Sequence, residues 1–368
     1  MTFTREPTVP SVQLTTLVAR NFRNLASLDV ELPAEGVVVL GENGHGKTNL
    51  LEAIYYLVLF RSLRGAKDRE LVRFGEAGFF VAADAGAHVT VGYEVEGRRK
   101  KVTIDRTERP RLADAVGHVT AVAFSPSDRG LVTGGPAGRR RFLDIVLSLS
   151  EPGYLGALTL MRQALKQRNA ALRLGRGDAA QAFDLPFTSA AATVARARRA
   201  WVARWRARYA ELTAALGEQE SAGLEYRPDH HRASDAAEHL RAALQQAFAR
   251  DERRGTTTVG PHRDDVGLLL GGHDLRTYGS AGQQRTAAIA LRLLEAETLG
   301  SAGGGTPVAL YDDVFAELDR GRQERLLGLI RTSLPGQAVV AAPRESEVPP
   351  ALLDLARWRM HGGRLERG

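Results

Sequence analysis

Cysteine is absent from this sequence, and aromatic residues make up only 6% of it. Without cysteine, disulfides and thiolate metal sites are excluded. No apolar run approaches the roughly 20 residues that a membrane-spanning helix needs. The first eleven residues include Arg5, Glu6 and two prolines but no apolar stretch, so they do not resemble a secretion signal. We therefore expect a soluble, cytoplasmic protein with a loose N-terminal extension.

Acidic residues are fewer than basic ones, since 43 Asp and Glu face 50 Lys and Arg for a net charge of +7. A positive balance suits a polyanionic partner, although it does not identify one. The chain has 368 residues, of which 43% are hydrophobic, and so it exceeds one average domain. We expect a head domain that carries one insertion.

A glycine-rich segment after an apolar strand is the strongest motif of the chain. Residues 36–40 are typical of a buried parallel strand, and residues 49–57 have helical spacing. Between them stands GxxxxGK[ST], the pattern of a phosphate-binding loop when it joins a strand to a helix. The candidate ATP-binding residues are Gly41, Glu42, Asn43, Gly44, His45, Gly46, Lys47, Thr48 and Asn49. Backbone N–H groups would hold the phosphates, Lys47 would reach the outer ones, and Thr48 would bind Mg²⁺. A glycine-rich turn that matches by chance is the alternative.

The order of the predicted elements divides the chain into three segments. Residues 1–150 contain the phosphate loop and alternating strands, as in the first half of an ATPase head with an antiparallel lobe. Residues 151–255 are rich in alanine, leucine and arginine and lack strand signals, which favours an inserted helical arm. Strands return in residues 256–368, where Asp265 to Leu270 and His273 to Tyr278 are predicted to form a hairpin.

An acidic strand end lies near the C-terminus. The apolar stretch from Val308 to Tyr311 runs directly into Asp312, which is the strongest candidate for a second Mg²⁺ ligand beside Thr48. In compact phosphate-loop kinases the two elements are much closer in sequence. The head must therefore be assembled from two separated halves.

A second candidate anion site begins the helix that precedes this strand. Ser280, Gly282 and Gln283 combine a hydroxyl, a backbone N–H and a helix N-terminus. Because the phosphate loop already holds one triphosphate, this second site has a different use. In ATPase heads with this order of elements it meets the γ-phosphate of ATP held by a partner subunit, and we expect the same role in trans here. An ordinary helix N-cap is the alternative.

Three further acids follow the predicted Mg²⁺ ligand. Asp313 is positioned to orient or deprotonate the attacking water, so Asp313 and Lys47 are the candidate catalytic residues. A helix cap or a buried ion-pair partner is the alternative for Asp313. Glu317 and Asp319 are expected at the seam of a dimer.

Taken together, these motifs resemble the RecF family, which is related to the heads of structural-maintenance-of-chromosomes (SMC) proteins and to ABC ATPases. The matching motifs occur in family order at residues 21–24, 41–53, 124–128, 135–144, 260–265, 280–285 and 312–319. The resemblance covers all but about the first dozen residues. It implies an α/β ABC-type P-loop ATPase head, with a mixed sheet, an antiparallel β lobe and an inserted helical arm.

The same resemblance implies how such a protein works. It implies an ATP-dependent homodimer with Mg²⁺ and two ATP molecules sandwiched between opposed heads. It also implies binding to double-stranded DNA near gaps or single/double-strand junctions, and cooperation with RecR and RecO in loading RecA. Arg20 and Asn21 are expected to flank the adenine. For residues 260–265 the family match is the sole explanation.

Two departures from the wider superfamily predict slow hydrolysis. Ser125 follows a core strand where ABC heads usually carry glutamine, and Ala342 ends another where many carry a γ-phosphate-sensing histidine. We therefore expect a weak, DNA-dependent ATPase that acts as a timer, with turnover no faster than about one per second.

Basic side chains supply the candidate DNA contacts. These are Arg64, Lys67, Arg139, Arg140, Arg199 and Arg206. A solvated helix face is the alternative for the arginines of the arm. The histidines at 230, 231 and 239 lack further ligand spacing and are predicted to be surface residues, not a metal site.

Two other functional classes compete with the DNA clamp. A transporter-type motor subunit would need a docking surface for a membrane partner, and the arginine-rich arm argues against it. A DNA-binding scaffold with a vestigial ATP site is disfavoured because Lys47, Asp312 and Asp313 are intact.

Overall fold

The computed structural model describes residues 13–229, 236–303, 305–315 and 318–367. The predicted N-terminal extension, the histidines at 230 and 231, and residue 317 therefore lie outside the described residues. The contacts divide the chain into two compact units. The first contains residues up to 128, 215–217 and 291–368, and the second contains residues 129–214 and 218–290. The two units are defined by contacts between residues, so they do not test the three segments predicted from the sequence. That division of the chain remains a prediction.

A largely parallel sheet forms the core of the first unit, with strand order β15-β14-β3-β13-β12-β8. Its strands are β3 (Gly36–Leu40), β8 (Ala121–Phe124), β12 (Val308–Asp312), β13 (Ala338–Ala342), β14 (Ala356–His361) and β15 (Arg364–Arg367). Only β15 runs antiparallel to its neighbour. Because β13 pairs in parallel with both β3 and β12, the carboxyl ends of these strands meet at one edge of the sheet.

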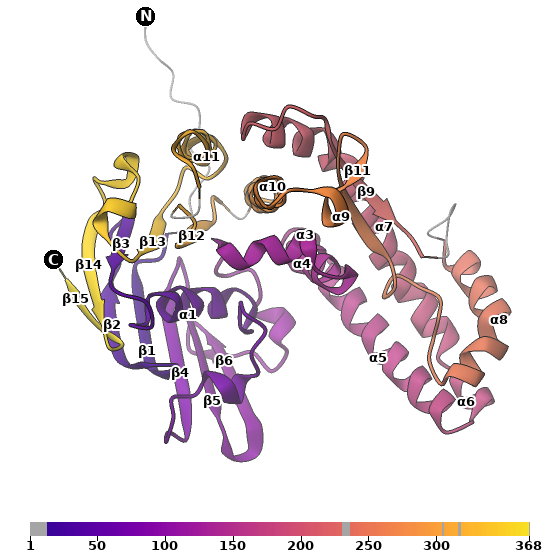
Figure 1. The fold of residues 1–368 in the computed structure, drawn as a ribbon. Coiled ribbons are helices and arrows are strands. Elements are labelled where there is room, and N and C mark those ends of the chain that lie inside the picture. Colours follow the sequence, from indigo (N-terminus) through magenta and orange to yellow (C-terminus); the bar gives the residue numbers. More distant parts are fainter. Residues whose placement is uncertain (1–12, 230–235, 304, 316–317, 368) are drawn as a thin grey trace, which may run out of the picture. The chain divides into compact units, whose positions relative to one another are not determined.

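A second, antiparallel sheet in this unit has the order β2-β1-β4-β5-β6-β7. Its strands are β1 (Thr16–Phe22), β2 (Leu25–Glu31), β4 (Gly78–Asp84), β5 (His88–Glu94), β6 (Arg99–Ile104) and β7 (Thr107–Glu108). Helix α1 (Lys47–Leu59) contacts strands of both sheets and lies between them (Figure 1). Its residues 50–58 are therefore all buried. The short α2 (Asp68–Leu71) and α11 (Arg320–Ser333) complete this unit.

The second unit is mainly helical. Its helices are α3 (Arg129–Thr133), α4 (Pro136–Ser150), α5 (Tyr154–Arg173), α6 (Gly177–Gln181), α7 (Asp184–Ala215), α8 (Ala237–Arg254) and α9 (Leu275–Tyr278). A three-stranded sheet accompanies them, with β9 (Ala222–Arg227), β10 (Asp265–Leu270) and β11 (His273–Asp274). Helix α10 (Ala281–Ser301) begins in this unit and ends in the first.

Buried arginines hold the long helices of the second unit together. Arg168 of α5 is fully buried and donates to Asp184 of α7 at 2.8 Å and to Asp251 of α8 at 2.9 Å. Arg198 of α7 is 1% exposed and donates to Asp144 of α4 at 2.7 Å. Burying an arginine is tolerable only when its charge is paired in this way. Arg198, part of the arginine run of the arm, is therefore a packing residue.

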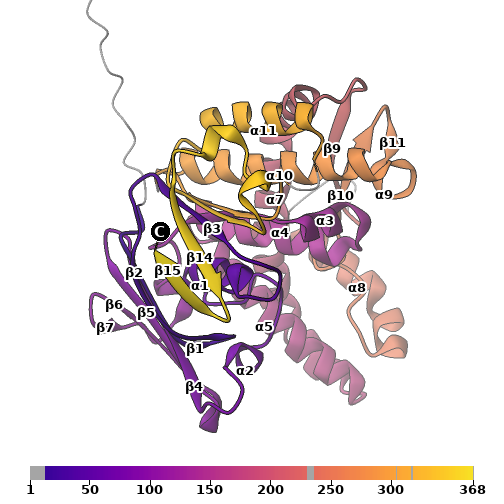
Figure 2. The ribbon, with the colours of Figure 1, turned by 60° about the vertical axis from the view of Figure 1, so that its left-hand side comes forward.

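Two local predictions were wrong, and one element was missed. A strand, β9, interrupts the segment expected to be helical, and it pairs with β10 through alternating Leu224 and Tyr226. The strand expected from His273 to Tyr278 ends at Asp274, whose side chain accepts the N–H of Arg276 and starts α9. The hairpin of β14 and β15 was not predicted. Figure 2 shows this hairpin beside β3, with which β14 pairs.

Candidate nucleotide site

The phosphate loop joins β3 to α1 as predicted. Gly44 and Gly46 have φ values of 83° and 113°, in the left-handed region that favours glycine. Gly46 is also the N-cap position of α1. A Cβ at Gly46 would lie 2.7 Å from the side-chain oxygen of Asn24, so the loop packs tightly against the turn between β1 and β2. The loop is thus a backbone cradle at the positive end of a buried helix.

Lys47 reaches back over the loop. It is 4% exposed, and its Nζ donates to the carbonyl oxygens of Gly41 at 2.6 Å and Glu42 at 3.2 Å. The ammonium group therefore lies inside the curl of the backbone, where it can exchange these neutral acceptors for phosphate oxygens.

Thr48 meets the acidic end of β12. Its Oγ1 donates to Oδ1 of Asp312 at 2.8 Å, across 264 residues of sequence. Burial raises the pKa of Asp312, although the hydrogen bond from Thr48 lowers it in part, and the neighbouring charge of Asp313 raises it further. A hydroxyl and a carboxylate at this distance are the pair of oxygen ligands that Mg²⁺ uses in phosphate-loop proteins.

Asp313 occupies a strained and partly buried position. Its φ is 51°, and its N–H donates to the carbonyl oxygen of Ala341 at 3.2 Å. Its Oδ1 is buried and has no hydrogen-bond partner among the described residues. Burial raises the pKa of Asp313, which Lys47 lowers in part and Glu347 raises. A buried carboxylate oxygen without a donor, next to a metal-ligand pair, is suited to accept a proton from water.

A buried carboxylate that sequence reasoning missed fixes α1. Glu52 is fully buried and accepts hydrogen bonds from Arg23 at 3.0 Å, from Ser62 at 2.5 Å and from Arg64. Burial alone would raise the pKa of Glu52, but these three donors hold it below its usual value. The signal was present, since Glu52 interrupts the apolar run of a helix and basic residues flank that helix.

Ser280 is an N-cap, and its side chain is also exposed. Its Oγ accepts the N–H of Gln283 at 3.2 Å, and the Gln283 side chain accepts the N–H of Ser280 at 2.8 Å. This reciprocal pair is a capping box. Ser280 is therefore the helix N-cap that was the alternative from the sequence. Its action in trans on a partner's γ-phosphate remains a separate prediction.

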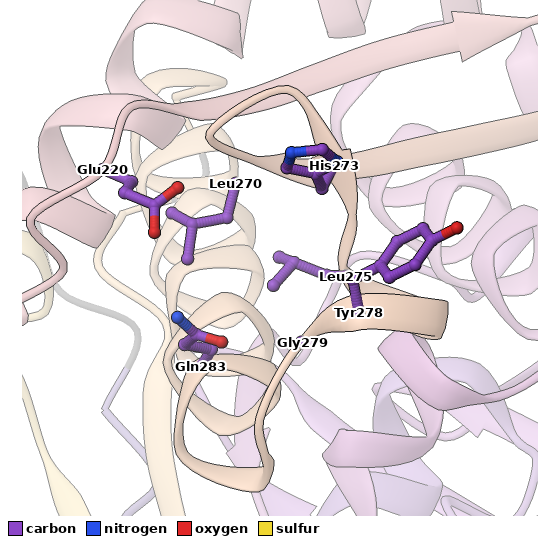
Figure 3. Close-up of a pocket in the computed structure, with 7 residues that line it drawn as sticks. All are labelled: Glu220, Leu270, His273, Leu275, Tyr278, Gly279 and Gln283. Carbon is purple, nitrogen blue, oxygen red and sulfur yellow. The ribbon is translucent and has the colours of Figure 1, made fainter.

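A cavity of about 320 Å³ opens beside this capping box (Figure 3). Its walls combine leucine side chains with polar groups: Glu220, Leu270, His273, Leu275, Tyr278, Gly279 and Gln283. Tyr278 is 73% exposed, and its ring lies edge-on to His273 at 5.7 Å. The exposed surface around Ser280 is thus both aromatic and polar.

Three of the candidate DNA contacts are bonded within the protein, although one of them, Arg64, is also exposed. Arg139 is 5% exposed, pairs with both carboxylate oxygens of Asp265 at 2.8 Å and donates to three backbone carbonyls, so its guanidinium is not available to DNA. Arg140 donates to the carbonyl oxygen of Asp264 at 2.7 Å. Arg64 is bound to Glu52 and Asn49.

The remaining candidates are Lys67, Arg206 and Arg199, of which Arg199 is half-buried. Arg206 and Lys67 are exposed. The guanidinium carbon of Arg199 lies 5.9 Å from the centre of the Tyr226 ring. Asp319 is exposed and caps α11 by accepting the N–H of Arg322 at 2.9 Å. The described residues contain no cluster of His, Cys, Asp or Glu side chains that would hold a metal ion on its own.

Sheet order, loop geometry and the Thr48–Asp312 contact define an ABC-type P-loop ATPase head with an added helical unit. The SMC head shares this fold, with a TM-score of 0.55 at 13% identity over 98% of each chain. No family model matches the chain. Individual relatives do match, and they show that the chain belongs to the RecF family.

The relatives cover almost the entire chain. The DNA replication and repair protein RecF of Anaeromyxobacter dehalogenans (strain 2CP-C) is 39% identical over 356 residues, or 92% of this chain and 95% of the relative. RecF of Myxococcus xanthus (strain DK1622) is 37% identical and covers 96% and 97%. A structure of the recombination mediator protein RecF-ATP in the RecFOR pathway has a TM-score of 0.89 at 29% identity and covers 99% and 100%. Within the described residues, no helix has the length and apolar character to span a bilayer.

Proposed function

We propose that this protein is an ATP-gated clamp that dimerises on double-stranded DNA near gaps and promotes recombinase loading in replication and recombinational repair. Slow ATP hydrolysis releases the clamp, so the protein acts as a switch in the cytoplasm. The observation that carries this proposal is the contact between Thr48 and Asp312 at the mouth of a glycine-lined loop. The similarity to RecF bound to ATP supports the same conclusion.

The residues of the loop fit a nucleoside triphosphate with Mg²⁺. The cradle accepts no side chain at Gly46, and the Lys47 ammonium already lies within it. Thr48 and Asp312 would hold Mg²⁺, which would neutralise charge on the phosphates. Asp313 orients and deprotonates the attacking water through its unpartnered oxygen. Hydrolysis is slow because Ser125 and Ala342 stand where many related heads carry a glutamine and a histidine.

The second half of the switch is supplied by another copy of the chain. Ser280, Gly282 and Gln283 bind the γ-phosphate held by the partner's phosphate loop, and Asp319 lies at the dimer seam. Lys67, Arg199 and Arg206 contact the DNA backbone, and Arg139 is withdrawn because it is buried. RecR, RecO and RecA are the expected protein partners, since the solved relatives belong to the RecFOR pathway.

A pair of Ser280 variants tests the dimer. Aspartate is as good an N-cap as serine, so Ser280→Asp keeps the helix start but places a negative charge where the γ-phosphate would bind. We expect an unchanged melting temperature and loss of the mass increase that ATP causes in analytical ultracentrifugation. Ser280→Thr is the control that retains both the cap and the hydroxyl.

Each outcome is informative. If Ser280→Asp dimerises with ATP as the unchanged protein does, Ser280 is only a cap and the trans contact is wrong. If the unchanged protein has the same mass with ATP, with ADP and without nucleotide, both with and without duplex DNA, the clamp itself is refuted. Lys47→Met should abolish nucleotide binding in the same assay.

A further inference from the structure

The turn between β14 and β15 lies against the phosphate loop. His361 pairs with Arg364, so Gly362 and Gly363 alone form the turn. Both glycines have positive φ values, 54° and 79°, as a two-residue hairpin turn requires. The hairpin extends the parallel sheet from β3, the strand that leads into the loop.

Three contacts connect this turn to one residue of the loop. The N–H of Gly363 donates to the carbonyl oxygen of His45 at 2.8 Å. The N–H of Gly362 donates to Nδ1 of His45 at 3.3 Å. The rings of His45 and His361 lie 4.5 Å apart, centre to centre, with a tilt of 55°. Both backbone donors of the turn are thus directed at His45.

The contact between the hairpin and the phosphate loop leaves no space for a side chain at Gly363 or at Gly41. A Cβ at Gly363 would lie 2.1 Å from the carbonyl oxygen of Asn24, and a Cβ at Gly41 would lie 2.3 Å from that of Met360. Real Cβ atoms do not approach oxygen so closely. The hairpin backbone therefore packs directly against the loop on one side and against the β1–β2 turn on the other.

The hydrogen bond from Gly363 fixes the orientation of one peptide plane. In a trans peptide, the carbonyl of one residue and the N–H of the next point in opposite directions. Because the His45 carbonyl points to the hairpin, the Gly46 N–H points away from it. Gly46 is the N-cap of α1, where free N–H groups bind phosphate. Without the hairpin, this peptide would be free to rotate, since Gly46 tolerates a wide range of backbone angles.

We propose that the turn formed by His361, Gly362 and Gly363 is a positioning element for nucleotide binding. It holds the His45–Gly46 peptide so that the Gly46 N–H faces the phosphates, although the turn itself does not touch the nucleotide. This inference rests on the proposed function, because it assigns an orientation to the same loop. The β14–β15 hairpin is thereby part of the ATP switch.

Two matched glycine variants test this role in the full chain. Gly86→Ala and Gly363→Ala both place alanine at a positive φ, 76° and 79°, so they carry similar backbone strain. A Cβ at Gly363 collides with Asn24, whereas no atom lies within 4 Å of a Cβ at Gly86, which lies between β4 and β5. We expect Gly363→Ala to weaken binding of Mg·ATP by about tenfold, because the displaced turn loses its two hydrogen bonds to His45, and Gly86→Ala to leave the affinity unchanged.

Two truncated chains test the same role without introducing a substitution. A chain ending at Gly363 keeps both N–H donors, whereas a chain ending at His361 loses them. Isothermal titration with Mg·ATP and with inorganic tripolyphosphate, at a temperature where circular dichroism shows each variant folded, measures the effect. Both ligands should lose affinity in the shorter chain, because the aligned group binds phosphate and not the base.

The possible outcomes separate this inference from the proposed function. Equal affinities across both pairs, with Lys47→Met unable to bind, would refute the positioning role and leave the ATP site intact. A lower melting temperature without any change in affinity would show that the hairpin only stabilises the fold, and would also refute the inference. If the unchanged protein binds neither ligand, the proposed function itself fails.

Discussion

Individual charged side chains in the nucleotide site are held at some cost to stability. Asp312 and Asp313 are adjacent and partly buried, and burial raises the pKa of both above the value of a free carboxyl. The charges of Arg64 and Lys47 offset the burial of Asp312 only in part, and that of Lys47 offsets the burial of Asp313 only in part. This arrangement is costly for the protein alone and favourable once a metal ion and phosphates are bound.

Asp313→Asn should therefore stabilise the nucleotide-free protein at neutral pH. Because the folded-state pKa is raised, the folded state binds more protons than the unfolded state, and stability falls as pH rises through that pKa. Asparagine removes the charge, so the melting temperature should rise at pH 7 and not at pH 3. The same variant should bind ATP and accumulate as a dimer. A lower melting temperature at pH 7, or a monomer with ATP, would contradict these roles.

A buried histidine predicts a second pH effect, in the helical unit. Burial lowers the pKa of His262 to about 4, although its hydrogen bond to the carbonyl oxygen of Thr257 raises it in part. Its Nδ1 has no partner among the described residues, so a proton there would meet no acceptor. The unfolded state then binds more protons between about pH 4 and 6.5, and stability falls as pH is lowered through this window, by at most about 3 kcal/mol.

Denaturant titrations of the unchanged protein and of His262→Gln between pH 4 and 7 measure this effect. Carboxylates titrate near the lower end of this range in both proteins, so the difference between the two curves isolates the histidine. The curves should converge as pH falls, because glutamine does not gain a charge. Parallel curves would show that His262 stays neutral or is already charged.

At the scale of elements, residues 260–265 join several helices and strands of the second unit. The carbonyl oxygen of Pro261 accepts from Arg198 of α7 at 2.7 Å, and Asp265 pairs with Arg139 of α4. Gly260 has a φ of 128°, and a Cβ there would lie 2.8 Å from the ring of Phe187. This segment, which sequence analysis explained only by family resemblance, is therefore the link between α4, α7 and β10.

The buried ion pairs between α5, α7 and α8 predict a large loss of stability. Arg168→Met leaves the carboxylates of Asp184 and Asp251 without their main partner, which typically costs about 3–5 kcal/mol. Lys166→Met, on an exposed face of the same helix, is the matched control and should change stability by less than about 0.5 kcal/mol. Differential scanning calorimetry measures both. A change below about 1 kcal/mol for Arg168→Met would show that the helices do not depend on this network.

At the scale of the whole molecule, the net charge of +7 overstates how much positive charge is exposed to DNA. Several arginines are occupied inside the protein, among them Arg139, Arg168 and Arg198. The exposed face of α7, which carries Arg206, is a better candidate for phosphate contacts than the total charge suggests. The net charge alone does not distinguish buried arginines from exposed ones.

Arg206→Ala should reduce the salt dependence of duplex binding. Each phosphate contact contributes about 0.9 to the slope of log affinity against log salt, so one lost contact should lower the slope by about that amount without altering sequence preference. Fluorescence anisotropy with a gapped duplex, in the presence of ATP, measures the slope. Arg253→Ala, an exposed arginine of α8, is the control. An unchanged slope would exclude Arg206 from the interface.

The sequence alone determined the phosphate loop, the acidic strand end and the head with an inserted arm, because each depends on local patterns of glycine, charge and apolar spacing. The glycine-rich loop between β3 and α1 and the acid at the end of β12 therefore lie where the sequence placed them, while their roles in nucleotide binding stay predictions. Only the tertiary structure decided which arginines are buried, that Glu52 anchors α1, and that β14 and β15 extend the sheet beside the loop. These features depend on contacts between residues far apart in the chain, such as the 317 residues between His45 and Gly362, and no local pattern encodes such a pairing.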